Sequence, residues 1–295
     1  MIFTQHYTLP QVVPYIQWGY FLHAWGFPFR FAEVTKVHDC EGCRAAWVAS
    51  LPSSEQDRAR EACRLMEDAR RLLQEWTRQQ AHTHFRVRLL EACGDGDDIY
   101  LPSLQRAIPL LRQQSVQSGQ PCLCLSDFLR PRSQGIADRI GLFASTVDKE
   151  LEQSFPQDEY QHLLAQTLSD RLAEATAELG HLQTRREWWG FSPDEELSID
   201  QLFAEQYQGK RPAVGYPSLP DQSINFLLDE LMDMHSLGIE LTETGAMKPH
   251  ASTSGLILSH PATRHFSVGP VGEDQLQDYA KRRNLPIDWL RRFVC

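Results

Sequence analysis

Rigidity and ligand-binding groups come together in the segment Arg211-Pro212-Ala213-Val214-Gly215-Tyr216-Pro217. Its two prolines fix the backbone dihedral φ, so few other conformations compete. Gly215 permits a positive φ or a close backbone approach. The planar guanidinium of Arg211 matches a carboxylate, and Tyr216 offers an aromatic face with a hydroxyl. The segment can therefore hold an amino-acid carboxylate and an aromatic ring, although the pattern alone also fits a surface turn with an incidental arginine.

A second group with chemical potential is the run His38-Asp39-Cys40-Glu41-Gly42-Cys43. Thiolates and imidazoles are zinc ligands, but a structural zinc site takes four ligands, usually as two such pairs. The chain has one CxxC pair, and Cys122-Leu123-Cys124 has CxC spacing within an apolar run. The sequence therefore predicts incidental cysteines and no metal site.

Carboxylates recur every four residues at Asp170, Glu174 and Glu178, within a stretch that has the periodicity of a helix. Each residue turns a helix by about 100°, so these carboxylates lie on a face different from the leucine-rich one. A row of this kind is most often a solvated surface. Spacing alone therefore predicts a solvent-facing acidic row.

The elements that position these residues follow from hydrophobic periodicity. Helices are predicted from Pro52-Ser53-Ser54 to Trp76, and over residues 104–114, 158–185, 198–207, 221–238, 273–283 and 288–292. Strands are predicted at 85–89 and 99–101 around a turn at 94–97, and again several times within 239–268. The aromatic-rich segment 15–31 has few basic residues among its rings, so we expect it to be buried. Without repeats or a linker, one α+β domain is the simplest reading.

Composition limits the possible partners and surroundings. The chain of 295 residues is 42% hydrophobic and 10% aromatic, which fits a globular core. Its net charge of -10 argues against nucleic acid or an anionic membrane as the main partner. No run of about 18 apolar residues and no signal peptide are visible, and the seven cysteines form no disulfide framework. We therefore expect a cytoplasmic protein.

Several blocks of the sequence resemble, in order, the C-terminal activation (reactivation) domain of cobalamin-dependent methionine synthase. The segment 211–216 resembles that family's RPAxGY signature, and Cys124-Leu125-Ser126-Asp127-Phe128 resembles its CLADF stretch. Further matching blocks are 135–147, 170–175, 189–191, 241–247, 252–255, 259–261 and 274–280. The resemblance is firm over 121–295 and weaker over 1–120, so it covers essentially the whole chain as one domain.

The resemblance implies a single C-shaped α+β domain with a bent antiparallel sheet flanked by helices. It also implies a shallow groove along one sheet edge that binds S-adenosylmethionine. In the family, the methyl group is offered to cob(II)alamin while an electron arrives from flavodoxin or a similar reductant. The protein positions the donor, and the cofactors supply the hard chemistry, so no catalytic acid or base is expected.

The resemblance also implies a set of contacts to the ligand and to cobalamin. Asp127 is expected to bind the ligand amino group, although an aspartate there also suits a helix or turn cap. Arg211 is expected to hold the carboxylate, and backbone groups at 211, 213 and 215 to meet the adenine. The full ligand-binding set is Asp127, Arg211, Pro212, Ala213, Val214, Gly215, Tyr216, His265 and Phe266. The set that faces cobalamin or the transferring methyl group is Asp170, Glu174, Glu205 and Tyr216.

One departure from the family concerns His265-Phe266, which stands where the family has a Tyr-Phe or Tyr-Tyr pair. Histidine can still stack and hydrogen-bond. A protonated imidazole would repel a sulfonium, however, so we expect ligand affinity that is lower or depends on pH.

The second departure concerns the other modules of a complete synthase. Homocysteine, folate and cobalamin modules do not fit in 295 residues, and no DxHxxG-type cobalamin motif is present. Together with the initial Met1, this favours a separately encoded reactivation subunit of a split synthase, or a reactivator of another corrinoid protein. The alternative is a non-catalytic docking or sensor module that regulates a corrinoid protein. An ordinary methyltransferase is disfavoured, because no strand, glycine-rich loop and helix unit is present.

Overall fold

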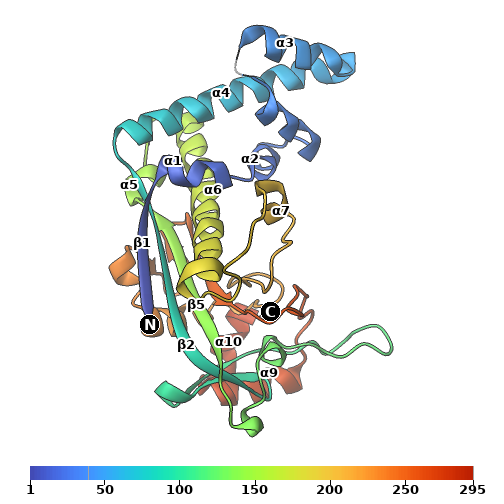
Figure 1. Cartoon of the computed structure of the whole chain (residues 1–295), viewed down its shortest axis with the longest axis vertical. Helices are drawn as coiled ribbons and strands as arrows, with labels where there is room; N and C mark the ends of the chain where they lie inside the picture. The colour runs from blue at the N-terminus through green and yellow to red at the C-terminus, as the bar shows by residue number, and fades with distance from the viewer. Residues whose placement is uncertain (39, 295) are drawn as a thin grey trace.

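The computed structural model describes residues 1–38 and 40–294. Helices at one end, a strand layer in the middle and two short helices at the other end are stacked along the long axis (Figure 1). The helices are α1 (Leu9–Val12), α2 (Trp18–Ala24), α3 (Glu41–Ser50), α4 (Gln56–Arg78), α5 (Lys149–Glu152), α6 (Glu159–Gln183), α7 (Ile199–Phe203), α8 (Ile224–Met232), α9 (Glu273–Arg283) and α10 (Ile287–Val294). The strands are β1 (Ile2–Thr8), β2 (His82–Asp95), β3 (Asp98–Leu101), β4 (Arg106–Pro109), β5 (Asp138–Val147), β6 (Glu240–Leu241), β7 (Met247–Lys248) and β8 (Ser252–Ile257).

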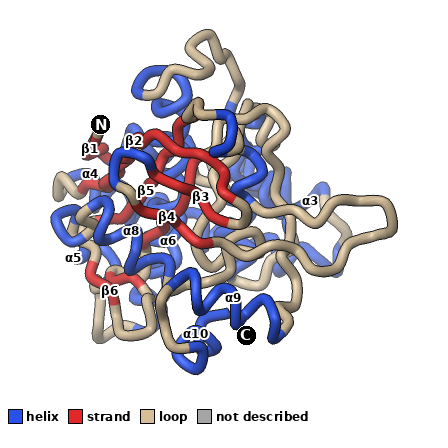
Figure 2. The backbone as a smooth tube through the Cα atoms, turned by 90° about the horizontal axis from the view of Figure 1, so that it is seen from below, coloured by secondary structure: helices blue, strands red, loops and turns tan. Residues whose placement is uncertain are grey.

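The main sheet is antiparallel in the order β4-β3-β2-β5-β8, with β1 paired to β2. Strand β2 belongs to both halves of the sheet, because residues 82–88 pair with β1 and residues 93–95 pair with β3. Strand β5 follows β2 along its other edge, from Thr83↔Val147 to Ala92↔Asp138. The strands therefore form a curved band rather than a flat layer (Figure 2). This confirms the expected α+β fold with a bent antiparallel sheet.

Helix α6 lies directly on one face of this sheet. The hydroxyl of Ser145 in β5 donates to the carbonyl of Ala173 at 3.0 Å, and Thr176 donates to Thr83 of β2 at 2.7 Å. At Gly180 a Cβ atom would lie 2.4 Å from the Phe85 ring, so the close approach needs glycine. The helix that carries the acidic row is therefore fixed rigidly to the strands.

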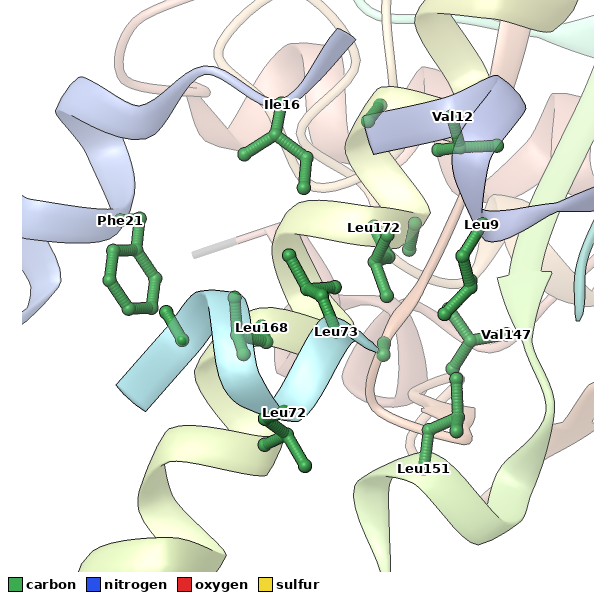
Figure 3. Packing of buried hydrophobic residues seen from close by; sticks show 14 of the residues in the cluster. Leu9, Val12, Ile16, Phe21, Leu72, Leu73, Val147, Leu151, Leu168 and Leu172 are labelled. Atoms are coloured by element: carbon green, nitrogen blue, oxygen red, sulfur yellow. The ribbon is translucent and has the colours of Figure 1, made fainter. Parts of the chain in front are cut away.

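The N-terminal helices close the core at the far end of α6. Leu72 and Leu73 of α4 meet Leu168 and Leu172 of α6, with Leu9, Val12 and Ile16 packed beside them (Figure 3). The aromatic segment 15–31 is partly as expected. Its residues Phe21, Phe27 and Phe31 are buried, whereas Tyr20 and Phe29 are about half exposed.

Periodicity placed the long helices correctly and failed on shorter stretches. The helix predicted over 104–114 is wrong, because residues 106–109 form β4, in which Ile108 pairs with Ile99. A left-handed residue, Gln105, starts that strand. The helix predicted over 198–207 ends at Phe203, and Glu205 takes a positive φ of 52°. The helix predicted to stop near Gly238 ends at Met232, where left-handed Asp233 follows.

On the opposite face, β2 is tied to the end of α8. Arg86 donates to the carbonyl of Met232 at 2.9 Å, and Arg88 donates to that of Leu231. These guanidinium groups satisfy carbonyls that have no partner inside the helix and oppose its negative end. Among residues 1–38 and 40–294, no helix is long and apolar enough to cross a membrane.

Candidate functional site

A cavity of about 670 Å³ lies where α6, the segment after α7, residues 211–218 and residues 265–267 converge. Tyr15, Gln17 and Tyr20 of the N-terminal segment also line this cavity. The lining residues are Tyr15, Gln17, Tyr20, Arg171, Glu174, Ala175, Glu178, Leu202, Phe203, Glu205, Tyr207, Arg211, Ala213, Tyr216, Pro217, Ser218, His265, Phe266 and Ser267. The structure thus brings Arg211, Ala213 and Tyr216 of the predicted loop to one cavity with Glu174, Glu205 and the His265-Phe266 pair. Pro212, Val214 and Gly215 of the same loop are not among the lining residues.

The loop that begins at Lys210 runs as an extra edge strand along β8. Lys210 and Leu258 exchange two backbone hydrogen bonds of 2.9 and 3.0 Å, and Val214 donates to the carbonyl of Ser254 at 2.9 Å. Backbone groups alternate sides along a strand, so those of Arg211 and the N–H of Ala213 point away from β8. These two N–H groups and the Arg211 carbonyl have no hydrogen-bond partner within the described parts of the chain. The cavity therefore has a free backbone edge.

Two glycines, Gly255 and Gly215, allow the backbone conformation of this edge. A Cβ atom on Gly255 of β8 would lie 2.2 Å from the Pro212 carbonyl oxygen, so the loop can approach β8 only because residue 255 is glycine. Gly215 has a φ of 86° and donates to the carbonyl of Leu219 at 2.9 Å. This confirms the positive φ that the sequence allowed at Gly215 and turns Tyr216 back toward α6.

Arg211 is the buried cation of the cavity. Its Nη2 lies 3.6 Å from Oε2 of Glu178, and its guanidinium carbon lies 5.2 Å from the centre of the Phe143 ring. Burial acts to lower the pKa of Arg211, but the carboxylates of Glu178 and Glu174 outweigh it and raise the pKa. Its Nε–H finds no partner within the described residues. Arg211 is thus a buried cation, fixed by Glu178, whose Nε–H remains available as a donor to a ligand.

Glu178 is the residue that the spacing argument misplaced. It is only 6% exposed, so the prediction that the whole acidic row faces solvent is wrong at this position. Burial raises the pKa of its carboxyl, against the pull of Arg211 and Arg185. Its Oε1 lacks a hydrogen-bond partner in the described structure. The four-residue repeat correctly places Glu178 in one row with Glu174, but it does not show that the Glu178 side chain is buried.

Polar groups behind the cavity wall are also left unpaired. Both ring nitrogens of His181 are buried without a partner in the described chain, and the ring packs edge-on against Tyr207 at 5.1 Å. Burial lowers the pKa of His181 well below its usual value, so the imidazole is neutral. Buried polar atoms without partners are rare and cost free energy. His181 lies outside the cavity lining, but the unpaired atoms of Arg211 and Glu178 belong to residues that line it, and they suit a cavity that a polar ligand completes.

Charged residues frame the cavity mouth. The hydroxyl of Tyr216 donates to Oε1 of Glu174 at 3.3 Å, and Nε2 of His265 lies 3.4 Å from Oε2 of Glu205. The hydrogen bond from His265 lowers the pKa of Glu205, which keeps it anionic. Asp170 is exposed and lies outside the cavity lining. Three carboxylates, at 174, 178 and 205, thus favour a cationic group in the cavity.

Asp127 lies outside the cavity lining, in the short 3-10 turn Leu125–Phe128. Its carboxylate accepts two hydrogen bonds from the Arg112 guanidinium, at 2.6 and 2.7 Å, and one from the backbone N–H of Cys124 at 2.8 Å. The last bond is the turn cap that the sequence offered as the alternative role. Asp127 first, and Asp97 with it, raise the pKa of Arg112. Contact between Asp127 and a ligand remains a prediction.

The cavity borders a second hollow at Phe266, and Asp127 lines neither of the two. The Phe266 ring lines both the cavity and the second hollow of about 310 Å³, which residues 113–123 bound on the other side. Gln113 ties the two segments together by donating to the carbonyl of Ser267 at 2.8 Å. Sequence patterns gave no sign of Arg112, whose partners Asp97 and Asp127 lie 15 positions away on either side. They also gave no sign that Tyr207 and Arg171 line the cavity, which they reach from separate segments.

Comparisons with known proteins agree with this arrangement. The family described as vitamin B12 dependent methionine synthase, activation domain, matches residues 8–284. A solved structure of the MetH reactivation domain bound to AdoHcy is 31% identical to this chain and superposes with a TM-score of 0.85. That similarity covers 99% of this chain and 89% of the other. This chain therefore belongs to the activation-domain family of vitamin B12 dependent methionine synthases.

Proposed function

We propose that this chain binds S-adenosylmethionine in the cavity and supports reductive remethylation of cob(II)alamin held by a separate corrinoid protein. The observation that carries the proposal is the free backbone edge at residues 211–213, which lies in the same cavity as the buried cation Arg211. The related reactivation domain was solved bound to AdoHcy, the demethylated form of the same ligand. The proposed role is that of a reactivation subunit of a split methionine synthase.

The cavity offers a complementary group for each part of this ligand. The N–H and carbonyl groups of Arg211 and the N–H of Ala213 match the acceptors and the amino group of adenine. We assign the Arg211 guanidinium to the ligand carboxylate, and Asp127, which lies outside the cavity lining, to the ligand ammonium group. Pro212 and Val214 hold the edge rigid, while Phe266 and His265 supply ring faces. The carboxylates of Glu174 and Glu205 lie where they stabilise a sulfonium.

The protein's part in the reaction is placement. S-adenosylmethionine supplies a methyl group on a positively charged sulfur, and the corrinoid supplies the cobalt that accepts it. No proton needs to move in that transfer, so the site requires no general acid or base. The residues of this chain orient the ligand and fix the direction from which a corrinoid reaches it.

A partner surface surrounds the cavity mouth. Tyr216 and Tyr20 are 54% and 52% exposed there, so both rings are accessible to a partner. Asp170, Glu174 and Glu205 add acidic groups to the same side. We assign this surface to a corrinoid protein, with electrons delivered by a flavodoxin-like reductant.

Reconstitution tests the proposal. The chain is mixed with a candidate corrinoid protein in the cob(II)alamin state, a flavodoxin-type reductant and S-adenosylmethionine, and methylcobalamin is followed by absorbance. We expect methylation that needs all four components and that falls strongly with Arg211→Ala. Docking of the two proteins without methyl transfer would contradict the proposal. That result would support the regulatory module instead, which the histidine at position 265 favours.

A further inference from the structure

A cluster of ligand atoms lies at the start of α3, outside the cavity lining. One ligand atom from each of His38, Cys40 and Cys43 lies within 4.8 Å of the other two. Among the described residues, this is the group of three that could hold a metal ion. Asp39, part of the same run in the sequence, lies outside the described residues.

The backbone already holds these side chains together. The N–H of Cys40 donates to Nδ1 of His38 at 3.2 Å, and the N–H of Cys43 donates to Sγ of Cys40 at 3.3 Å. The second contact exists because Cys40 is the N-cap residue of α3, so its side chain faces the first free N–H groups of the helix. Little chain entropy remains to be lost when a cation joins the three ligands.

The donor set selects the class of cation. Two thiols and one imidazole suit borderline and soft metals, whereas Mg²⁺ and Ca²⁺ prefer oxygen ligands. Two cysteines with one histidine also occur as a three-ligand zinc set in which a fourth position is open. All three side chains are exposed and both thiols are free, so a cation can reach them.

We propose that His38, Cys40 and Cys43 form a Cys2His site for a thiophilic divalent cation of the Zn²⁺ type, with a fourth position left for water. This goes against the expectation from spacing, which judged the run from His38 to Cys43 too short of ligands because a structural zinc site usually takes two such pairs. The site ties the 3-10 segment Phe29–Lys36 to the start of α3. It thereby fixes the outer end of the molecule, where α3 lies against α4 (Figure 1).

Cobalt(II) titration tests the site on the full-length, fully reduced, metal-free chain. Thiolate ligation gives a sulfur-to-cobalt charge-transfer absorption, and tetrahedral geometry gives intense visible bands. We expect saturation at one equivalent and displacement of the cobalt by zinc. The variants Cys40→Ser and Cys43→Ser should lose the charge-transfer band or weaken binding at least tenfold, and His38→Ala should weaken it measurably.

The matched control is Cys122→Ser, which removes a partly exposed cysteine outside the cluster. It should bind cobalt as the unchanged chain does. Circular dichroism and thermal unfolding in the absence of metal confirm that each variant is folded. Absence of the band in the unchanged chain, or an equal band in Cys40→Ser, overturns the proposal. None of the three proposed ligands lines the cavity, so binding of S-adenosylmethionine is measured separately and does not decide this result.

Discussion

The Nη2 atom of Arg211 lies 3.6 Å from Oε2 of Glu178, and each residue keeps one buried polar atom without a partner in the described chain. A buried guanidinium and a buried carboxylate that each keep an unpaired polar atom cost free energy. A third group that hydrogen-bonds to these atoms would recover that cost. That group fits a ligand carrying both a carboxylate and a positive charge. The ion pair between Arg211 and Glu178 thus connects the backbone edge at residues 211–213 to α6. This connection is the reason that the edge and the helix face the same cavity.

Arg211→Lys is predicted to weaken S-adenosylmethionine binding at least tenfold, or about 1.4 kcal/mol. A lysine keeps the charge but loses the planar fork that binds a carboxylate through two hydrogen bonds. Equilibrium titration measures the effect. Arg171→Lys is the matched control, since Arg171 also lines the cavity and has no assigned contact with the carboxylate. Equal losses in the two variants would contradict the assigned role.

His265→Tyr is predicted to tighten S-adenosylmethionine binding. A tyrosine keeps a ring that can stack and hydrogen-bond, but it cannot carry the positive charge by which an imidazolium would repel a sulfonium. Glu205 stays anionic in the unchanged chain, because the hydrogen bond from His265 lowers its pKa. Equilibrium titrations compare the variant with His260→Tyr, a histidine outside the cavity lining. Clearly weaker binding by His265→Tyr would count against the mapping.

Asp127→Asn is predicted to weaken binding about tenfold by removing the carboxylate assigned to the ligand ammonium group. The same change also loosens Arg112. Asp97→Asn supplies the control, because Asp97 accepts from Nε of Arg112 at 2.6 Å and has no assigned ligand contact. Affinity should fall in the first variant and stay nearly unchanged in the second. If Asp127→Asn and Asp97→Asn bind S-adenosylmethionine equally well, Asp127 has no ligand contact and acts only as the turn cap seen in this structure.

Gly255→Ala is predicted to disrupt the ligand-binding edge itself. Its new methyl group would lie 2.2 Å from the Pro212 carbonyl oxygen and push the loop off β8. We expect at least tenfold weaker ligand binding and a free energy of unfolding lower by about 1–3 kcal/mol. Gly141→Ala adds a methyl group against Ile257 instead, at 3.0 Å. Gly141→Ala should therefore lower the free energy of unfolding, measured in urea, and leave the affinity for S-adenosylmethionine, measured by titration, unchanged.

The parts of the fold that follow from local pattern were predictable from sequence. The apolar stripe of α4, the leucine face of α6 and the span of α9 all match their predicted ranges closely. Residues 104–114 were not predictable in this way. Their strand β4 is short, and it exists because β3 offers it a partner.

The site shows the same division between local and non-local information. The 211–216 loop was visible because its prolines, glycine and arginine are adjacent in the chain. The burial of Glu178 depends on Arg211, 33 positions away, and the pairing of Asp127 with Arg112 depends on a loop that returns on itself. The His38 cluster needed coordinates for another reason, since the backbone turn into α3 decides which side chains converge.

The most direct test of the central claim is calorimetric titration of the purified chain with S-adenosylmethionine, alongside Arg211→Ala. We predict saturable binding of one ligand per chain, which the variant loses or weakens strongly while circular dichroism shows that it remains folded. Absence of binding by the correctly folded, unchanged chain would contradict the claim that this cavity holds S-adenosylmethionine.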